Sequence, residues 1–275
     1  MQGSGVQLHV RSIGGGPGAQ VVVLVHGGPG LDLESLDSLS PLAGPGRELV
    51  GYDQRGAGRS SRPADGQYGL EAQLADLDAV RRWTGAGQVD LVGASFGGLL
   101  AAAYTAGMPA RVRRLVLLDP APLDFGEFLA GQQRFGNRQL QLQHAGLVPD
   151  PLPADRGDSC VPMLLALLPA YLGDPREKPP PGAITTCTAS TSHATYAAIR
   201  DRGRLDDVAA GLVHFDRPAL VLDGERDPFG PQWPTRAQQL LVNARLTRIR
   251  IPGAGHLPYA ERPDLVLPAL AGFLS

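Results

Sequence analysis

Ser95 is the residue of this sequence best suited to act as a nucleophile, because it stands in the pattern Gly-x-Ser-x-Gly. The segment V-D-L-V-G-A-S-F-G-G, residues 89–98, places this serine between an apolar strand pattern and the start of a helix. Gly93 and Gly97 have no side chains, so the strand and the helix can pass close together around a sharp turn. Free backbone N–H groups at the helix start favour a developing negative charge. The pattern predicts attack on a carbonyl carbon.

A second glycine-rich loop, H-G-G-P-G at residues 26–30, directly follows a strand pattern at residues 20–25. This strand is apolar on both faces, which is typical of the middle of a parallel sheet. Open α/β sheets build their sites in loops at the carboxyl ends of such strands. We expect the N–H of Gly28, or as second choice that of Gly27, to form an oxyanion hole with the N–H of Phe96. The alternative is an ordinary tight turn.

The elements that must position these loops alternate between strand and helix patterns. Apolar runs and helical spacing of apolar residues distinguish the two. The alternation predicts an α/β fold with a mostly parallel sheet. Strands are expected at 6–10, 20–25, 48–52, 89–94, 114–118, 217–223 and 247–251, and helices at 70–83, 99–104, 234–242 and 263–274.

The alternation stops between residues 123 and 213, where Pro149, Pro151 and Pro153 break the pattern and short apolar stretches predict small helices. We expect residues 1–122 and 214–275 to form one α/β core. Residues 123–213 are expected to form an inserted, mainly helical cap that covers Ser95 and decides specificity and water access.

A third motif, D-Q-R-G-A-G-R-S at residues 53–60, follows the strand pattern at 48–52. Arginine donors beside an aspartate and glycines order a loop more often than they perform chemistry, so a scaffold role is expected. Together with H-G-G-P-G at 26–30 and the Gly-x-Ser-x-Gly turn, this motif resembles the proline iminopeptidase branch of the α/β-hydrolases. The resemblance covers all but the middle segment and implies an α/β-hydrolase fold, with a mostly parallel sheet and a helical cap.

The resemblance also implies an acid and then a histidine after the serine. Asp227 lies in the loop four residues past the strand at 217–223, which is the usual position of the triad acid in this fold. Asp223 and Glu225 are rivals nearby. Asp119 is a further alternative, because some members of this fold carry the acid after the strand that follows the serine.

His256 follows Gly253-Ala254-Gly255, just after the last predicted strand. A histidine in a loop of small residues can swing its ring over the serine without a clash, as a general base requires. His26 precedes its loop and is interpreted as structural.

Proline iminopeptidases release an N-terminal residue from small peptides, and their caps present acidic side chains to the free amino group of the substrate. In this chain Glu127, Glu177, Asp174 and Asp201 are the acids available for such a contact, although none of them matches a family motif. Glu127, Glu177 and Gly27 are the candidate substrate-binding residues. Phe96 and Pro228 depart from the family pattern, in which tryptophan usually follows the serine and an acid follows the triad aspartate.

The sequence therefore predicts a serine hydrolase that forms an acyl-enzyme on Ser95, with His256 as general base and Asp227 orienting it. A proline-iminopeptidase-like aminopeptidase or amidase is the first hypothesis. A carboxylesterase-like hydrolase of a small non-peptide ester or amide is the alternative. A receptor that binds small molecules without turnover is a hypothesis from a different class.

The composition and charge of the chain limit the classes of binding partner that we expect. A net charge of −2 and a pI near 6.3 give no reason to expect nucleic acid or an anionic membrane. The first residues lack a secretory pattern and no apolar run is long enough for a membrane span, so a cytoplasmic protein is expected. Cys160 and Cys187 fit no metal-ligand spacing. Free buried thiols are the first expectation for them, and a disulfide is the alternative. No metal or organic cofactor is implied, and a small molecule or short peptide is the expected partner.

Overall fold

The computed structural model describes residues 1–178, 184–201 and 205–275. Its strands are β1 (Val10–Gly14), β2 (Gln20–Val25), β3 (Arg47–Tyr52), β4 (Val89–Ala94), β5 (Val112–Leu118), β6 (Pro218–Gly224) and β7 (Arg245–Ile251). They form a seven-stranded sheet in the order β1-β3-β2-β4-β5-β6-β7. β1 is antiparallel to β3, and all other neighbouring strands are parallel. The predicted mostly parallel sheet is confirmed.

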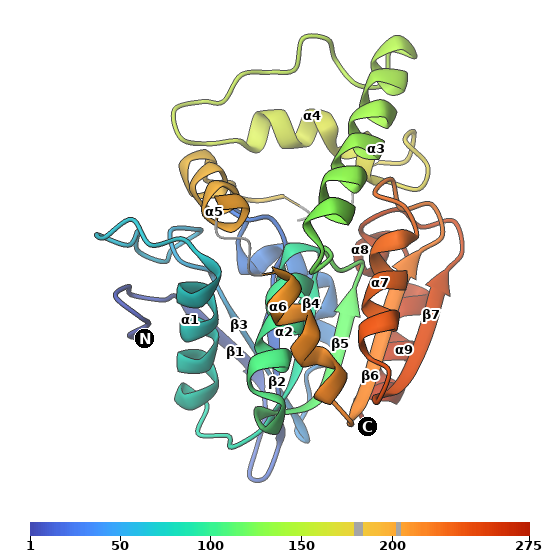
Figure 1. The fold of residues 1–275 in the computed structure, drawn as a ribbon. Helices are drawn as coiled ribbons and strands as arrows, with labels where there is room; N and C mark the ends of the chain where they lie inside the picture. The colour runs from blue at the N-terminus through green and yellow to red at the C-terminus, as the bar shows by residue number, and fades with distance from the viewer. Residues whose placement is uncertain (179–183, 202–204) are drawn as a thin grey trace.

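Helices cover both faces of this sheet (Figure 1). One face carries α1 (Leu70–Trp83), α2 (Phe96–Gly107) and α6 (Leu205–Gly211), and the other carries α9 (Pro263–Phe273) with a 3-10 helix at Leu33–Leu42. Two shorter helices complete the core, α7 (Gln232–Leu240) against β6 and α8 (Pro258–Glu261) against α9.

The central strand β2 is apolar on both faces, and helices cover both faces of the sheet. In β2, Val23 and Val25 pack into the cluster beneath α2, whereas Val22 and Leu24 pack into the cluster beneath α9. Side chains alternate along a strand, so one apolar run supplies two separate cores. These cores fix the sheet whose carboxyl ends carry the functional loops.

Three helices stand over the carboxyl ends of the strands, α3 (Phe125–His144), α4 (Val161–Tyr171) and α5 (Ala189–Asp201) (Figure 1). α6 follows them in the chain but packs on α2. The predicted limits of the cap, 123 and 213, therefore stay a prediction. Among the described residues, no helix is both long enough and apolar enough to cross a membrane.

Cys160 and Cys187 form a disulfide with a Cα–Cα distance of 5.1 Å, so the expectation of two free thiols was wrong. Cys160 immediately precedes α4, and Cys187 lies just before α5. The Cys160 N–H donates to the Cys187 carbonyl at 3.1 Å, and Ser159 forms a bridge with Thr188. This backbone pairing holds the two cysteines side by side, which the sequence pattern did not indicate.

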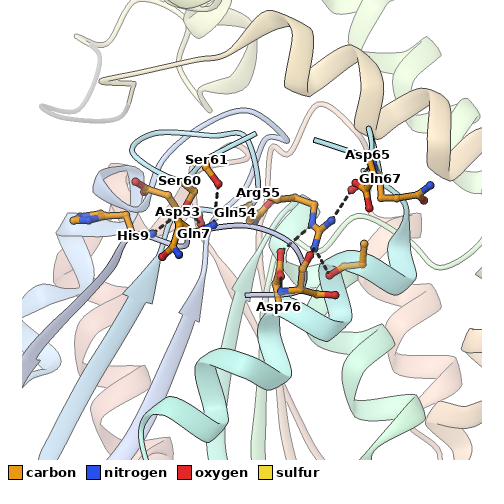
Figure 2. Close-up of polar contacts among 12 residues, drawn as sticks. Gln7, His9, Asp53, Gln54, Arg55, Ser60, Ser61, Asp65, Gln67 and Asp76 are labelled. Atoms are coloured by element: carbon orange, nitrogen blue, oxygen red, sulfur yellow. Dashed lines mark hydrogen bonds and ion pairs between the residues drawn. The ribbon is translucent and has the colours of Figure 1, made fainter. Parts of the chain in front are cut away.

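The loop at residues 53–60 forms a buried polar network that packs against α1 (Figure 2). Arg55 donates to the Asp76 carboxylate at 2.8 Å and to the carbonyls of Gln67, Ser4 and Ala72. Their side chains are almost completely buried, at 1% exposure for Arg55 and 0% for Asp76. These contacts join the N-terminal residues, the loop and α1, as a scaffold role requires.

Candidate functional site

Four chemically active side chains lie just beyond the carboxyl ends of neighbouring strands. Ser95 follows β4, Asp119 follows β5, Asp227 lies beyond β6, and His256 lies beyond β7. Because these strands are parallel and adjacent, their ends meet at one edge of the sheet. The fold therefore gathers residues that are far apart in the sequence.

Ser95 lies in a sharp turn between β4 and α2, with a backbone φ of 51° and ψ of −118°. A residue other than glycine rarely adopts a positive φ, so the surroundings must hold this conformation. The neighbouring glycines make the turn possible. A Cβ atom on Gly97 would lie 2.1 Å from the Val25 carbonyl oxygen, and one on Gly93 would lie 2.3 Å from the Gly97 oxygen.

A series of hydrogen bonds links the serine, the histidine and one acid. His256 Nε2 lies 2.9 Å from Ser95 Oγ, and His256 Nδ1 lies 3.0 Å from Asp227 Oδ2. The other oxygen of this carboxylate accepts from the Phe229 N–H at 2.9 Å. The geometry suits proton transfer from the hydroxyl to the imidazole, with the carboxylate holding the ring.

The electrostatics keep the Asp227 carboxyl ionised. Burial acts to raise its pKa, but the charge of His256, its hydrogen bond and a hydrogen bond with Asp119 together lower the pKa below its ordinary value. Asp227 is thus a buried anion next to the imidazole. An anion there stabilises an imidazolium when the ring takes up a proton.

The backbone on both sides of His256 is held by Glu261, a residue that the sequence reasoning missed. The carboxylate of Glu261 accepts from the N–H groups of Gly255 and Leu257 at 3.0–3.1 Å, and from Gly173 N–H at 2.8 Å. Burial raises the pKa of Glu261. An acid shortly after the histidine, at the start of a helix pattern, was the available signal, because such acids often accept from free N–H groups.

Gly28 and Phe96, the residues expected to form the oxyanion hole, line the same cavity as Ser95. Within the described part of the chain, neither the Gly28 N–H nor the Phe96 N–H donates to another residue. Gly27 is packed against the serine, since a Cβ atom placed there would lie 3.3 Å from Ser95 Cβ. The Tyr196 hydroxyl, from α5, donates to the Gly28 carbonyl at 3.1 Å and so ties this loop to the cap.

His26, in contrast, is part of the scaffold. Its Nδ1 lies 2.8 Å from the Gly27 carbonyl, and its Nε2 accepts from the Gln54 N–H at 3.0 Å. Burial lowers its pKa. The neutral ring joins the loop at 26–30 to the loop at 53–60.

A cavity of about 430 Å³ opens above Ser95, between the core and the cap. One side is an aromatic wall formed by Phe128, Phe229 and Trp233. The Phe229 and Trp233 rings are stacked at 4.6 Å, and the Phe128 and Trp233 rings at 5.8 Å. The ring of His256 lies 4.5 Å from that of Phe229. Other cavity-lining residues are mostly apolar and include Leu99, Met163, Leu164, Leu167, Leu168, Tyr171 and Ile199.

None of the described residues that line this cavity is an aspartate or glutamate. Glu127 lies outside it, with its carboxylate 3.9 Å from Arg134 Nη2. Glu177 is exposed near Asp174, whose carbonyl accepts its N–H. The side chain of Asp201 lies outside the described part of the structure. Among the described residues, Glu127, Glu177 and Asp174 are therefore not part of the cavity that Ser95 lines.

Asp119 is brought into the site although it is not bonded to the histidine. Among the described residues, Asp119, Asp227 and His256 are the one group of side chains whose possible metal-ligand atoms lie together, all within 4.8 Å. Both ring nitrogens of His256 already face Ser95 and Asp227.

Comparisons with known proteins agree with this architecture. The chain is 29% identical over 264 residues to 1-acylglycerol-3-phosphate O-acyltransferase ABHD5 of Rattus norvegicus, covering 88% of this chain and 74% of that protein. It is 30% identical over 129 residues to a proline iminopeptidase of Lacticaseibacillus rhamnosus, covering 46% and 44% of the two chains. The crystal structure of a proline iminopeptidase from Mycobacterium smegmatis matches with a TM-score of 0.68 at 21% identity, covering 98% of this chain and 94% of that one.

The sequence profile described as alpha/beta hydrolase fold matches residues 20–263, which is most of the chain. The similarities to proline iminopeptidases support the resemblance seen in the motifs at 26–30 and 53–60. The chain therefore belongs to the alpha/beta hydrolase fold family and resembles its proline iminopeptidase branch.

Proposed function

We propose that this chain is a serine hydrolase that cleaves neutral carboxylic esters carrying an apolar or aromatic group. The observation that carries the proposal is the hydrogen-bonded series from Ser95 through His256 to Asp227, which opens onto an apolar cavity. A nucleophile bonded to a base, and a base oriented by a third group, are the features of covalent acyl transfer.

In this mechanism His256 Nε2 takes the proton of Ser95 Oγ as the oxygen bonds to the ester carbonyl carbon. The tetrahedral oxyanion accepts hydrogen bonds from the N–H groups of Gly28 and Phe96. His256 then gives its proton to the departing alkoxide, so an alcohol leaves and an acyl-serine remains. Water repeats the steps, releasing the acid and restoring the hydroxyl. Asp227 keeps the ring oriented and stabilises the imidazolium.

The lining of the cavity supports an ester without a charged amino group. Recognition of an ammonium group requires a carboxylate or several acceptors, because a buried unpaired charge is costly. The described lining offers no carboxylate, but it offers the aromatic wall. Stacked rings favour a flat or bulky apolar group. An aminopeptidase is the second candidate, favoured by the similarity to proline iminopeptidases.

The test compares p-nitrophenyl acetate, butyrate and benzoate with prolyl and alanyl p-nitroanilides whose amino groups are free or acetylated. We expect ester cleavage, with kcat/KM for butyrate roughly tenfold above that for acetate, since two more methylenes are buried at about 0.8 kcal/mol each. A fluorophosphonate should label the wild type. Ser95→Ala should not be labelled and should lose at least about 10⁴-fold in kcat while it stays folded.

Cleavage of free but not acetylated anilides, without ester cleavage, would replace the esterase proposal by the aminopeptidase. Full activity in Ser95→Ala would overturn the mechanism for either substrate. A folded wild type that neither cleaves these substrates nor reacts with the fluorophosphonate would instead indicate a receptor.

A further inference from the structure

Asp119 is a buried carboxyl group that the mechanism above does not use. It follows β5 and is completely buried, with a backbone φ of 40° that residues other than glycine rarely adopt. Its N–H donates to the Leu222 carbonyl at 2.9 Å, and its Oδ1 accepts from the Gly224 N–H at 3.0 Å. Asp119 is thus fastened to β6 by its backbone and by one carboxyl oxygen.

The second oxygen, Asp119 Oδ2, is buried and finds no donor among the described residues. The carboxyl of Asp227 is close by, within the 4.8 Å group that also includes His256. Both Asp227 oxygens accept hydrogen bonds, from Phe229 N–H and from His256. Two ionised carboxylates at this separation would repel each other, and neither can donate.

A proton on Asp119 Oδ2 removes both difficulties. The group then has an O–H donor aimed at an anion, and the repulsion disappears. The pKa of Asp119 is raised well above its ordinary value, and burial is the largest cause. The charge of Asp227, a hydrogen bond between Asp119 and Asp227, and the charge of Asp223 also raise it. The hydrogen bond from the Gly224 N–H acts in the opposite direction, but the pKa is still raised.

The charged and titratable groups around Asp119 do not offer it a cation. Asp223 is bound by Arg248 and Arg250, which donate to its two oxygens. Within the described part of the chain, no ion pair includes Asp119. Tyr259 is a further neighbour, and burial followed by the charge of Asp119 raises its pKa. His256 faces Asp227 rather than Asp119.

We propose that Asp119 is a positioning residue that works in its protonated form, donating from Oδ2 to the Asp227 carboxylate. This hydrogen bond holds the carboxylate in the orientation that receives His256 Nδ1–H, so the Nε2 lone pair points at Ser95. The inference rests on the proposed function of Asp227 and His256. It assigns the two aspartates different states, one neutral donor and one anion, at the same edge of the sheet.

Two substitutions separate a neutral donor from an anion. Asp119→Asn keeps a donor for Asp227 and an acceptor for the Gly224 N–H, and asparagine tolerates a positive φ. We expect it to keep kcat within about threefold of the wild type. Asp119→Gly also tolerates the backbone but has no donor, so kcat should fall roughly 10- to 100-fold with KM unchanged.

Infrared spectroscopy reads the protonation state without relying on turnover. The difference spectrum between the wild type and Asp119→Asn at neutral pH should contain a carboxylic-acid C=O band that moves in D₂O. Asp264→Asn is the matched control, because Asp264 is exposed and ion-paired with Arg262, which lowers its pKa. That difference spectrum should contain ionised-carboxylate bands and no carboxylic-acid C=O band.

Ionised-carboxylate bands for Asp119, or a loss of activity in Asp119→Asn as large as that in Asp119→Gly, would overturn the proposal. Failure of the proposed function is distinguishable from either result, because the wild type itself would then not react with the fluorophosphonate.

Discussion

Replacing Arg55 by methionine tests whether the loop at 53–60 is a scaffold. The guanidinium is buried with four acceptors, the Asp76 carboxylate and the carbonyls of Gln67, Ser4 and Ala72. Removing it leaves an uncompensated carboxylate in the interior, where, among the described residues, only the Ser4 N–H still donates to it. Breaking such a buried pair costs about 3–5 kcal/mol.

Urea denaturation at neutral pH should therefore give Arg55→Met a free energy of unfolding about 4 kcal/mol below that of the wild type. For a chain of this size the melting temperature should fall by on the order of 10 °C. Arg59→Met is the matched control. Arg59 is in the same loop and pairs with Glu34 at 2.7 Å, but its side chain is 67% exposed. Such a pair contributes less than about 1 kcal/mol.

The pH dependence gives a second check on the same variant. Burial already raises the pKa of Asp76 in the wild type, against the hydrogen bond and charge of Arg55, which lower it. Without Arg55 the folded-state pKa must rise further. A raised folded-state pKa makes the folded protein more stable as the pH falls toward the unfolded value, so acid should partly restore Arg55→Met. A loss no larger than that of Arg59→Met, or one that does not shrink in acid, would refute the reasoning.

Three further outcomes are expected. The double variant Cys160→Ser, Cys187→Ser should have a free energy of unfolding about 3.5 kcal/mol lower than the wild type, because the disulfide closes a loop of 27 residues. Equal urea midpoints for this variant and the oxidised wild type would contradict the disulfide. Gly97→Ala should abolish ester hydrolysis and destabilise the fold by about 3 kcal/mol, because its Cβ would lie 2.1 Å from the Val25 carbonyl oxygen. Gly107→Ala, in the same helix with nothing within 4 Å, should leave both unchanged. Folded Asp119 keeps its proton at pH values above its ordinary pKa of 3.8. As the pH rises, the free energy of unfolding of the wild type should therefore decrease relative to that of Asp119→Asn, by up to about 1.4 kcal/mol per pH unit. Parallel stability curves from pH 5 to pH 7 would refute this.

Several elements of the core were predictable because their sequence signals are local. The helix expected at 70–83 begins and ends at those residues in α1, and the strand expected at 20–25 matches β2. The helix after the serine begins at Phe96 rather than Leu99, because glycines near its start hid its periodicity. The order of serine, acid and histidine along the chain was predicted from the family resemblance. The sequence itself gives no distances between these residues.

The strand expected at 6–10 was wrong, and the reason is physical. Val6 and Leu8 alternate and are buried in the core, as a strand pattern requires. However, the Leu8 N–H donates to the Met1 carbonyl, and β1 begins only at Val10. Alternating apolar residues indicate that one side of a segment is buried. A β-strand also needs a neighbouring strand with free backbone N–H and carbonyl groups.

Features that join distant segments could not be read from the sequence. The aromatic wall draws Phe128 from α3, Phe229 from a loop and Trp233 from α7, and no periodicity links them. The disulfide forms because the residues just before α4 and just before α5 lie next to each other. The role of Glu261 depends on its hydrogen bonds to Gly173 and to the loop that carries His256, and the sequence does not show that these segments are neighbours.

The aromatic wall also gives the protein an optical reporter. The sequence has two tryptophans, Trp83 and Trp233. Trp83 is 50% exposed on α1, whereas Trp233 is 2% exposed, stacked on Phe229 and edge-on to the His256 ring. Once Trp83 is changed to phenylalanine, the remaining indole emission comes from the lining of the cavity. Its intensity will follow ligand entry directly, on native protein, before any bond is broken.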